Sequence, residues 1–132
     1  MMIDSDFILF AMKDDKPIGV AVVLPDFNEL FAEMNGRFLS KGFFRFIKYL
    51  WTKKANIKRL RILILGVLPD FDHTGASSAL YLKIIETCRQ KGYKGGEMSW
   101  ILEDNLKMNK AAEMLGGKRY KTYRLYHILF NK

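Results

Sequence analysis

Residues 59–117 read RLRILILGVL PDFDHTG ASSALYLKIIETCRQKG YK GGEMSWIL ED NLKMNKAAEML GG. This stretch alternates two apolar runs, typical of buried strands, with two helical patterns of apolar residues. The expected elements are a strand over 59–68, a tight polar loop over 69–75, a helix over 76–92, a strand over 95–102 and a helix over 105–115. A strand that stops before a glycine-containing loop, which then opens a helix, directs the unpaired N–H groups of that helix towards one point. The sequence therefore predicts a site that attracts phosphate.

The beginning of the chain predicts a β-hairpin. Residues 7–12 are rich in strand-forming types, Asp14-Asp15 is a turn signal, and residues 17–24 form a continuous apolar run. The tail KRYKTYRLYHILF, residues 118–130, alternates enough to form one or two closing strands. A hairpin that feeds a strand–helix–strand–helix unit predicts an α+β or mixed α/β fold.

The middle of the chain carries an unevenly distributed positive charge. Asn28 is expected to cap a short helix that Gly36 ends, and an amphipathic helix is predicted over 41–52, so that a basic helical insertion covers about 28–56. Between positions 37 and 61 the chain has nine basic residues and no acidic one: Arg37, Lys41, Arg45, Lys48, Lys53, Lys54, Lys58, Arg59 and Arg61. One interpretation is a helix packed on the sheet with a solvated basic face. The others are attraction to an acidic ligand, an acidic carrier protein, a membrane surface or nucleic acid.

Length and composition indicate one domain over residues 1–132. Apolar residues make up 49% of the chain, which is enough to fill a core of that size. Cys88 is the single cysteine, so no disulfide framework and no cysteine-based metal site can form, and no metal is expected. The first apolar run is too short to span a bilayer and has acidic residues where a signal peptide needs basic ones. A soluble, cytoplasmic protein is therefore expected.

One set of residues carries a family resemblance: Val67, Pro69, Asp70, Phe71, Gly75, Ser77, Ala79 and Leu80, followed by Asn105, Met108, Ala112, Gly116 and Gly117. This set resembles the cofactor-binding core of the Gcn5-related N-acetyltransferases, a superfamily that uses acyl-coenzyme A (acyl-CoA). The resemblance implies the acyl-CoA N-acyltransferase fold, with a central mixed sheet flanked by helices. It also implies acetyl-CoA or another acyl-CoA as cofactor.

The resemblance also implies that the beginning of the usual domain is missing. Members of the superfamily usually open with a strand and two helices that form one wall of the acceptor site. Here the hairpin starts within the first ten residues. Either residues 28–56 fold over that side, or the chain resembles only the cofactor-binding portion of a larger protein or a form completed by a partner subunit. The SWILEDN run and residues 119–126 resemble the C-terminal part of larger bacterial members whose substrates are unassigned.

In the family, successive backbone amides of the loop bind the pyrophosphate of CoA. The resemblance places this site at His73, Thr74, Gly75, Ala76, Ser77 and Ser78. Gly75 would let an anion approach the backbone closely, and the small serines can donate hydrogen bonds at the start of the helix. Asp72 departs from the family pattern, which usually has an arginine or a glutamine at this position. Its carboxylate would repel pyrophosphate. The alternative is an ordinary capping turn with no ligand.

The strand before the loop would hold the thioester arm of the cofactor. By resemblance, Leu65, Gly66 and Val67 present unpaired backbone groups where two strands splay apart, and such groups stabilise a developing oxyanion. Gly66 also fits a β-bulge without any ligand. Asn105 would contact the pantetheine arm, or would only cap the second helix.

The catalytic acid is where the chain departs most from the family, which often has a tyrosine at the position of Ala112. Tyr123 is the candidate substitute from the tail, with Tyr120 and Tyr126 as alternatives. Nothing in the sequence selects among the three, and aromatic residues there also fit simple packing.

The candidate bases are Glu97 and Glu103, which flank the second strand of the stretch. Either carboxylate could take a proton from an amine, directly or through water. The alternative for both is a solvated carboxylate beside Lys94 or Lys107.

Three functions remain open at this point. The first is an acyl-CoA-dependent N-acyltransferase, expected to transfer an acetyl group to a primary amine of a small molecule or a protein. The second is a non-catalytic binding domain with the same fold or a part of a larger protein, which Asp72 and Ala112 favour. The third is a module that binds nucleic acid or an acidic protein through residues 37–61. An aromatic-rich helix in a shortened domain could also be buried in a homodimer.

Overall fold

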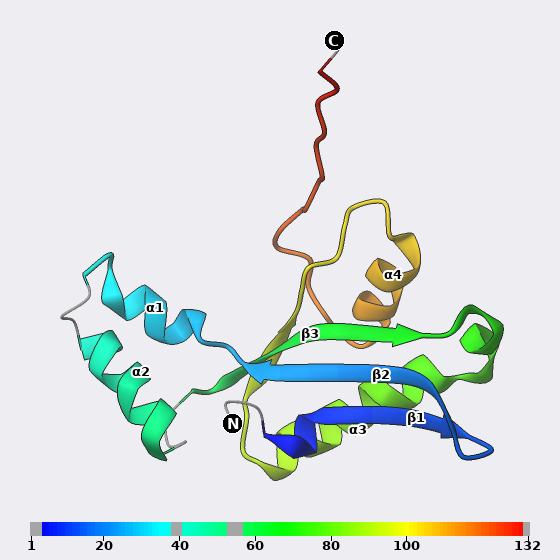
Figure 1. Cartoon of the computed structure of the whole chain (residues 1–132), viewed down its shortest axis with the longest axis horizontal. Helices are drawn as coiled ribbons and strands as arrows, with labels where there is room; N and C mark the ends of the chain where they lie inside the picture. Colours follow the sequence, from blue (N-terminus) through cyan, green and yellow to red (C-terminus); the bar gives the residue numbers. More distant parts are fainter. Residues whose placement is uncertain (1–3, 38–40, 53–56, 131–132) are drawn as a thin grey trace. The chain divides into compact units, whose positions relative to one another are not determined.

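The computed structural model describes residues 4–37, 41–52 and 57–130 (Figure 1). The chain divides into two compact units, Met1–Glu97 and Met98–Lys132, and each is described by itself. The elements in chain order are a 3₁₀ helix η1 (Ser5–Phe7), β1 (Ile8–Lys13), β2 (Lys16–Pro25), α1 (Asn28–Met34), α2 (Lys41–Thr52), β3 (Arg59–Val67), a 3₁₀ helix η2 (Pro69–Thr74), α3 (Ala76–Gln90), β4 (Gly95–Met98) and α4 (Leu106–Met114).

The four strands form one mixed sheet in the order β1-β2-β3-β4, which confirms the predicted sheet. The pairs β1–β2 and β2–β3 are antiparallel. Along β3 and β4 the contacts advance in the same direction. The Lys94 amide donates to the Lys58 carbonyl over 2.9 Å, and the guanidinium of Arg61 donates to Glu97 over 2.8 Å. These two strands are therefore parallel, as expected when a helix connects them.

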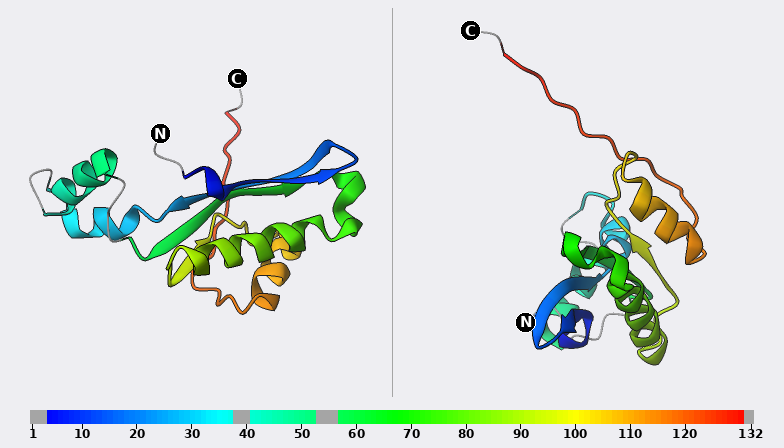
Figure 2. Two further views of the ribbon diagram at one scale, coloured as in Figure 1. Left: turned by 90° about the horizontal axis from the view of Figure 1, so that it is seen from below. Right: turned by 90° about the vertical axis from the view of Figure 1, so that its right-hand side faces the viewer.

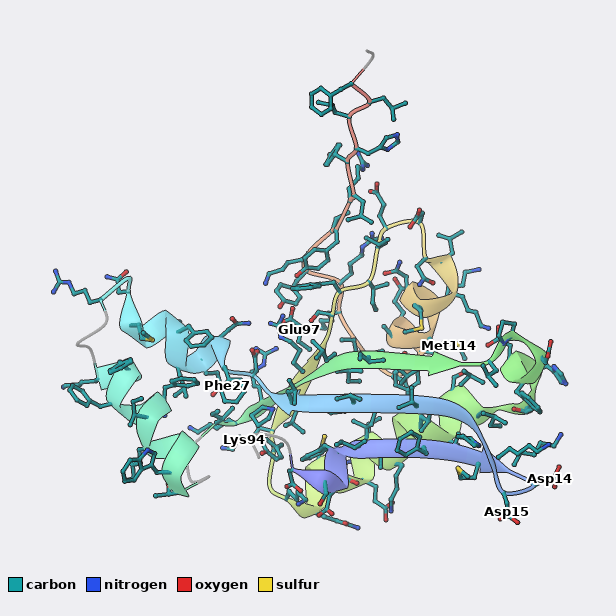
Figure 3. The ribbon with its side chains drawn as sticks, in the orientation of Figure 1. Asp14, Asp15, Phe27, Lys94, Glu97 and Met114 are labelled. Atoms are coloured by element: carbon teal, nitrogen blue, oxygen red, sulfur yellow. The ribbon has the colours of Figure 1, made fainter. Side chains whose placement is uncertain are left out.

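The predicted hairpin is present, and its turn has the expected chemistry. Asp14 and Asp15 have φ angles of 48° and 60°, so both adopt the left-handed conformation that a two-residue hairpin turn requires. Both residues lie at the tip of the hairpin (Figure 3). Aspartate tolerates this conformation better than most residues, which explains why the chain turns here.

The main core lies between the sheet and α3. Its buried members are Phe7, Ala21, Val23, Leu60, Leu80 and Ile84. Figure 2 shows α3 along one face of the sheet. The ring of Tyr93 packs edge-on against Phe7 with 5.7 Å between centroids, so the end of α3 and η1 close the same core. Burial of these side chains, at about 25 cal/mol per Å² of apolar surface, is what holds β3 and α3 together.

The opposite face of the sheet carries apolar side chains that remain exposed. Phe10 pairs with Val20, and Val22 pairs with Ile64, so the register places all four on one face. Phe10 is 60% exposed and Ile64 is 51% exposed. The expectation that residues 28–56 would fold over this side is therefore not met by the part of that segment that the structure describes.

Instead, α1 and α2 pack on each other and form a second, smaller core. Leu30 and Ile57 are buried there, with Phe27 and Phe46 packed against them. The rings of Phe27 and Phe46 meet at 5.9 Å (Figure 3 marks Phe27 at the start of α1). A Cβ placed on Gly42 would lie 2.5 Å from the Leu30 carbonyl oxygen, so only glycine allows this approach of the two helices.

The ends of α1 differ from the sequence expectation. Asn28 is the first helical residue rather than the cap, and its amide donates to the carboxylate of Asp26 over 3.2 Å. Asp26 therefore supplies the capping acceptor. Asn35, with φ 44°, ends the helix one residue before Gly36.

Two further predictions for the second half of the chain are only partly correct. The second strand of the stretch ends at Met98 rather than at Leu102, and residues 69–74 form a 3₁₀ helix rather than an open loop. The prediction of closing strands over 118–130 is wrong, because the structure has only one bridge there, between Leu102 and Tyr123. A segment in which apolar and polar residues alternate does not form a strand when no neighbouring surface pairs with it.

The unit Met98–Lys132 is held together by contacts around Glu103. Its amide donates to the Tyr123 carbonyl over 3.0 Å, and its carboxylate forms an ion pair with the guanidinium of Arg124. The hydrogen bond from Arg124 lowers the pKa of Glu103 below its usual value. These contacts join the segment before α4 to the segment after it.

We expect Gly42→Ala to separate α1 from α2 and to lower the free energy of unfolding by about 1–3 kcal/mol, because the added methyl group meets backbone atoms. Chemical denaturation gives the stability, and hydrogen exchange of the Leu30 amide reports whether α1 opens. The matched control is Gly95→Ala, since a Cβ there meets nothing within 4 Å. Equal stability of the two variants would show that the close packing at Gly42 is not required.

We expect the Glu103–Arg124 contact to stabilise the second unit only at pH values above the usual pKa of a carboxyl group. A lowered folded pKa means that the contribution is present above 4.5, the value without these contacts, and is lost as the pH falls through the lower folded value. Hydrogen exchange of the Glu103 amide should therefore be faster in Arg124→Gln than in the wild type at pH 7, and this difference should shrink as the pH falls below 4.5.

Arg89→Gln removes the same charge outside this unit and serves as the control for that comparison. A difference between Arg124→Gln and the wild type that persists unchanged at about pH 3 would contradict the electrostatic origin of the contact.

Candidate functional site

The amino-terminal end of α3 offers backbone donors without a side-chain cap. Gly75 precedes the helix in the left-handed conformation, φ 79°, and provides no capping side chain. The first intrahelical bond is donated by the Ala79 amide to the Gly75 carbonyl over 3.0 Å. The amides of Ala76, Ser77 and Ser78 come before it and have no partner within the helix. Together with the helix dipole, these three donors favour an anion.

The space beside Gly75 is open. A Cβ at this position would meet no atom within 4 Å, and its positive φ angle favours glycine over other residues. Thr74, the last residue of η2, donates its hydroxyl to the Phe71 carbonyl over 2.6 Å, which holds the turn before α3. His73 is exposed in the same turn. The structure thus has a turn and a helix start at the predicted positions, and the binding of phosphate there stays a prediction.

The charge around this turn is mixed. Asp72 lies in η2, one turn before the amides of α3, and its carboxylate opposes an anion. Lys13, from the end of the hairpin, places its ammonium group 5.3 Å from the centroid of the Phe71 ring. The hairpin therefore brings a cation to η2. Sequence reasoning missed Lys13, because no local pattern shows that the hairpin tip reaches residues 69–74.

The strand before the turn exposes backbone at its end. Gly66 pairs with Val20 and lies on the open face of the sheet, where a Cβ placed on it would meet no atom within 4 Å. Leu65 and Val67 point to the other face, towards the core. The bulge expected at Gly66 is instead at Leu63, which has no partner between the pairs Val22–Ile64 and Val23–Ile62.

The length of β4 determines which part of β3 it accompanies. β4 has four residues and β3 has nine, and the contacts between them involve Lys58, Arg61, Lys94 and Glu97. As a strand, β4 therefore runs along only the first part of β3. The unpaired backbone predicted at residues 65–67 for a thioester arm stays a prediction.

Glu97 is buried and paired with a cation. It is 7% exposed, and its carboxylate accepts from the Arg61 guanidinium at 2.8 Å, while Asp26 lies 3.5 Å from the same nitrogen. The carboxylate of Glu97 is therefore occupied by a cation in the interior of the sheet. The contact joins β3 to β4, so Glu97 has a structural role whether or not it also acts in catalysis.

Three predicted site residues belong to the unit Met98–Lys132: Glu103, Tyr123 and Asn105. Glu103 is occupied by Arg124, which lowers its pKa and makes it a weaker base. Tyr123 contributes its backbone carbonyl to the Glu103 amide. The side chain of Asn105 accepts from the Met108 amide over 3.2 Å, so Asn105 is the N-cap of α4. The structure shows this capping role, and the contact of Asn105 with a cofactor stays a prediction.

The remaining predicted residues belong to the unit Met1–Glu97: Leu65, Gly66, Val67, Glu97 and the six residues from His73 to Ser78. Within the described residues, no group of three or more His, Cys, Asp or Glu side chains could hold a metal ion. Cys88 is half-buried in α3, and burial raises the pKa of its thiol. A thiol in this state is a poor nucleophile.

Two curated proteins are similar to nearly the whole chain. It is 35% identical over 130 residues to the bacterial ceramide synthase of Caulobacter vibrioides and 33% identical over 130 residues to protein YghO of Escherichia coli. Each alignment covers 95% of this chain and 33% of the relative. The chain therefore spans about a third of the length of the curated relatives it matches. No protein-family model matches the chain.

Solved acetyltransferases have a similar structure. The aminoglycoside acetyltransferase AAC(6')-Iy, in complex with a bisubstrate analogue that contains CoA, aligns with a TM-score of 0.59 and 17% identity over 92% of this chain and 67% of that chain. The aminoglycoside 6'-N-acetyltransferase AAC(6')-IG of Acinetobacter haemolyticus aligns with a TM-score of 0.55 and 14% identity over 94% of this chain and 70% of that chain. The predicted fold is thereby confirmed: the chain has the fold of the Gcn5-related N-acetyltransferase superfamily.

Proposed function

We propose that this chain is the acyl-CoA-binding part of an N-acyltransferase. The observation that carries the proposal is the start of α3 after Gly75, which has no side-chain cap and leaves open space where a Cβ of residue 75 would lie. The fold supports it, because the similar AAC(6')-Iy structure contains a CoA analogue. The identity of the acceptor amine and that of the transferred acyl group are likewise proposals.

The residues around Gly75 fit the pyrophosphate of CoA. The amides of Ala76, Ser77 and Ser78 would donate to its oxygens, and a ligand would occupy the open space beside Gly75. The ammonium group of Lys13 would partly neutralise the added charge. This set of donors is sufficient for an anion, although Asp72 makes the site less favourable than a purely cationic one.

When bound, an acyl-CoA supplies a thioester whose carbonyl an amine can attack. The nitrogen forms a bond to the carbonyl carbon, the carbon–sulfur bond breaks, and the amine loses a proton while the thiolate gains one. Backbone donors of residues 65–67 would stabilise the charge on the carbonyl oxygen, and the open face at Gly66 would admit the acyl group. For the two proton transfers, Glu97, Glu103 and Tyr123 remain the candidates within this chain.

For the acceptor we propose a long-chain amine rather than a sugar amine. The relative from Caulobacter vibrioides is a ceramide synthase at 35% identity, and a ceramide is an amide of a long-chain amino alcohol. The aminoglycoside acetyltransferases are similar at only 17% and 14% identity. An acceptor with a long apolar chain would also find apolar surface on the open sheet face, where Phe10 and Ile64 are exposed.

A binding domain without catalysis is the second candidate. Glu97 and Glu103 are both paired with arginines, so neither is poised as a base in this structure. Ala112 also occupies the position where the superfamily often has its catalytic tyrosine. This candidate predicts binding of acyl-CoA without turnover.

Substitution of Gly75 by aspartate and by asparagine tests the phosphate site. Both residues tolerate a positive φ angle and have the same size, so the two variants differ in charge alone. A carboxylate at contact distance repels a phosphate by about 1–4 kcal/mol, so we expect the Kd for CoA to rise at least about fivefold more in Gly75→Asp than in Gly75→Asn. Calorimetric titration with CoA measures both. Wild-type affinity in both variants would place the cofactor elsewhere.

Turnover separates the enzyme from the binding domain. We expect acyl transfer from acetyl-CoA or palmitoyl-CoA to sphinganine, detected by mass spectrometry of the amide product, and not to kanamycin. The measurement uses this chain and, in parallel, the full-length Caulobacter vibrioides relative as a positive control. CoA binding without any amide product from this chain would favour the binding domain, and transfer to kanamycin alone would contradict the proposed acceptor.

A further inference from the structure

The helix α2 exposes a continuous apolar stripe to solvent. At about 100° per residue, Phe44, Ile47 and Trp51 fall within one arc of about 60° on the helix surface. Phe44 is 61% exposed, and Trp51 is 87% exposed. Large side chains at such exposure lose favourable burial energy, so they indicate a surface that another phase or molecule covers.

The packing of α2 explains why this stripe is left free. The face of α2 that carries Gly42 and Phe46 is used by α1, through the close approach at Gly42 and the ring contacts of Phe46 with Phe27 and Phe31. The apolar arc of α2 is therefore wider than the arc covered by α1, which is its packing partner among the described elements. Figure 1 shows α1 and α2 beyond the end of β2, away from the face of the sheet that α3 covers.

Basic side chains lie next to the exposed stripe. Lys41 and Lys48 are exposed, and they lie three residues before and four residues after Phe44. At about 100° per residue, both are therefore beside Phe44 on the helix surface. The sequence from 37 to 61 has seven further basic residues and no acidic one, and of these Arg61 is paired with Glu97 and Asp26 from outside the segment. An occupant of this surface must accept both apolar side chains and a dense positive charge.

We propose that α2 docks on the surface of an anionic lipid bilayer. Phe44, Ile47 and Trp51 would enter the boundary between headgroups and acyl chains, and Lys41 and Lys48 would contact the phosphates of anionic lipids. This combination of an aromatic and aliphatic stripe with flanking lysines is what interfacial helices use. The inference does not rest on the proposed function, because it uses only α1, α2 and the charge of their segment.

Length and charge argue against the other occupants. The twelve residues of α2 extend over about 18 Å, and the hydrocarbon core of a bilayer is about 30 Å thick, so α2 would lie in the interface. No helix within the described ranges is long and apolar enough to cross a membrane. A second copy of the chain would bring a like charge to the same surface. Nucleic acid would match the charge, but Ile47 offers it neither a hydrogen bond nor a stacking face.

Tryptophan fluorescence can observe the docking directly, because the chain has two tryptophans. In Trp100→Phe only Trp51 emits, and in Trp51→Phe only Trp100 emits. With vesicles of phosphatidylglycerol and phosphatidylcholine, we expect a blue shift and quenching by brominated acyl chains for Trp51 and no change for Trp100. Vesicles of phosphatidylcholine alone should give weaker binding, since the charge contribution is lost. The experiments contain no acyl-CoA, so their outcome is separate from that of the Gly75 variants.

Sedimentation with the same vesicles then separates the two parts of the surface. We expect Phe44→Ser/Ile47→Ser and Lys41→Glu/Lys48→Glu each to reduce the bound fraction at least about fivefold. The controls are Leu82→Ser, an exposed leucine of α3, and Lys110→Glu, an exposed lysine of α4. Circular dichroism of each variant confirms that it is folded.

Three outcomes would overturn the proposal: no binding of the wild type to anionic vesicles, equal losses in the control variants, or a Trp51 emission that stays unchanged while protein sediments. Tight, salt-sensitive binding to a polynucleotide with none to vesicles would assign the surface to nucleic acid instead. A concentration-dependent dimer that Phe44→Ser abolishes, again without vesicle binding, would assign it to a second copy of the chain.

Discussion

The arrangement of β3, β4 and α1 depends on the ion pairs that the guanidinium of Arg61 forms. This guanidinium lies 2.8 Å from the carboxylate of Glu97 in β4 and 3.5 Å from that of Asp26 at the end of β2, and all three side chains are nearly buried. Asp26 in turn accepts from the first amide of α1. Removal of one partner of a buried ion pair leaves an unpaired charge and costs about 3–5 kcal/mol. The cluster therefore fixes how β4 starts and where α1 leaves the sheet.

The same cluster limits what the site can do chemically. Two carboxylates around one cation leave a local charge of about −1 at the start of β3, while the phosphate site at the other end of β3 needs positive potential. The six residue steps from Arg61 to Val67 correspond to about 20 Å of extended chain, so the cluster is distant from the turn that follows β3. The strand thus has the proposed anion-binding turn after one end and a structural ion cluster near the other. This separation explains how a basic chain can keep buried carboxylates without weakening the turn at Gly75.

Much of the fold was predictable from local patterns in the sequence. The helix over 76–90 and the hairpin with its Asp14-Asp15 turn follow from apolar period and turn chemistry alone. The prediction of closing strands over 118–130 was wrong, because an alternating pattern is equally typical of a strand and of an exposed segment. Only a partner surface decides between them. The bulge was expected at Gly66 and lies at Leu63, since a bulge depends on the register with β2, which no single strand encodes. The candidate site divides along the same line: the turn at Gly75 was predictable because a strand, a glycine and a helix start are adjacent in sequence. The partners of Glu97 and Glu103 were not, because Arg61 and Arg124 are 36 and 21 positions away from them.

The helix pair α1 and α2 has a small core and exposed apolar side chains. Among the described residues, the core between α1 and α2 has Leu30 and Ile57 as its buried members. Its bonds to the sheet include the Asp26 amide to the Arg59 carbonyl and the Lys58 amide to the Glu29 carboxylate. A core of this size contributes little stability on its own. An external surface that buries Phe44 and Trp51 would therefore stabilise the helix pair as well as bind it, because ordering of the helices and burial of the stripe occur together. Any such gain would reach β3 through Asp26 and Arg61, since these residues join the start of α1 to the sheet.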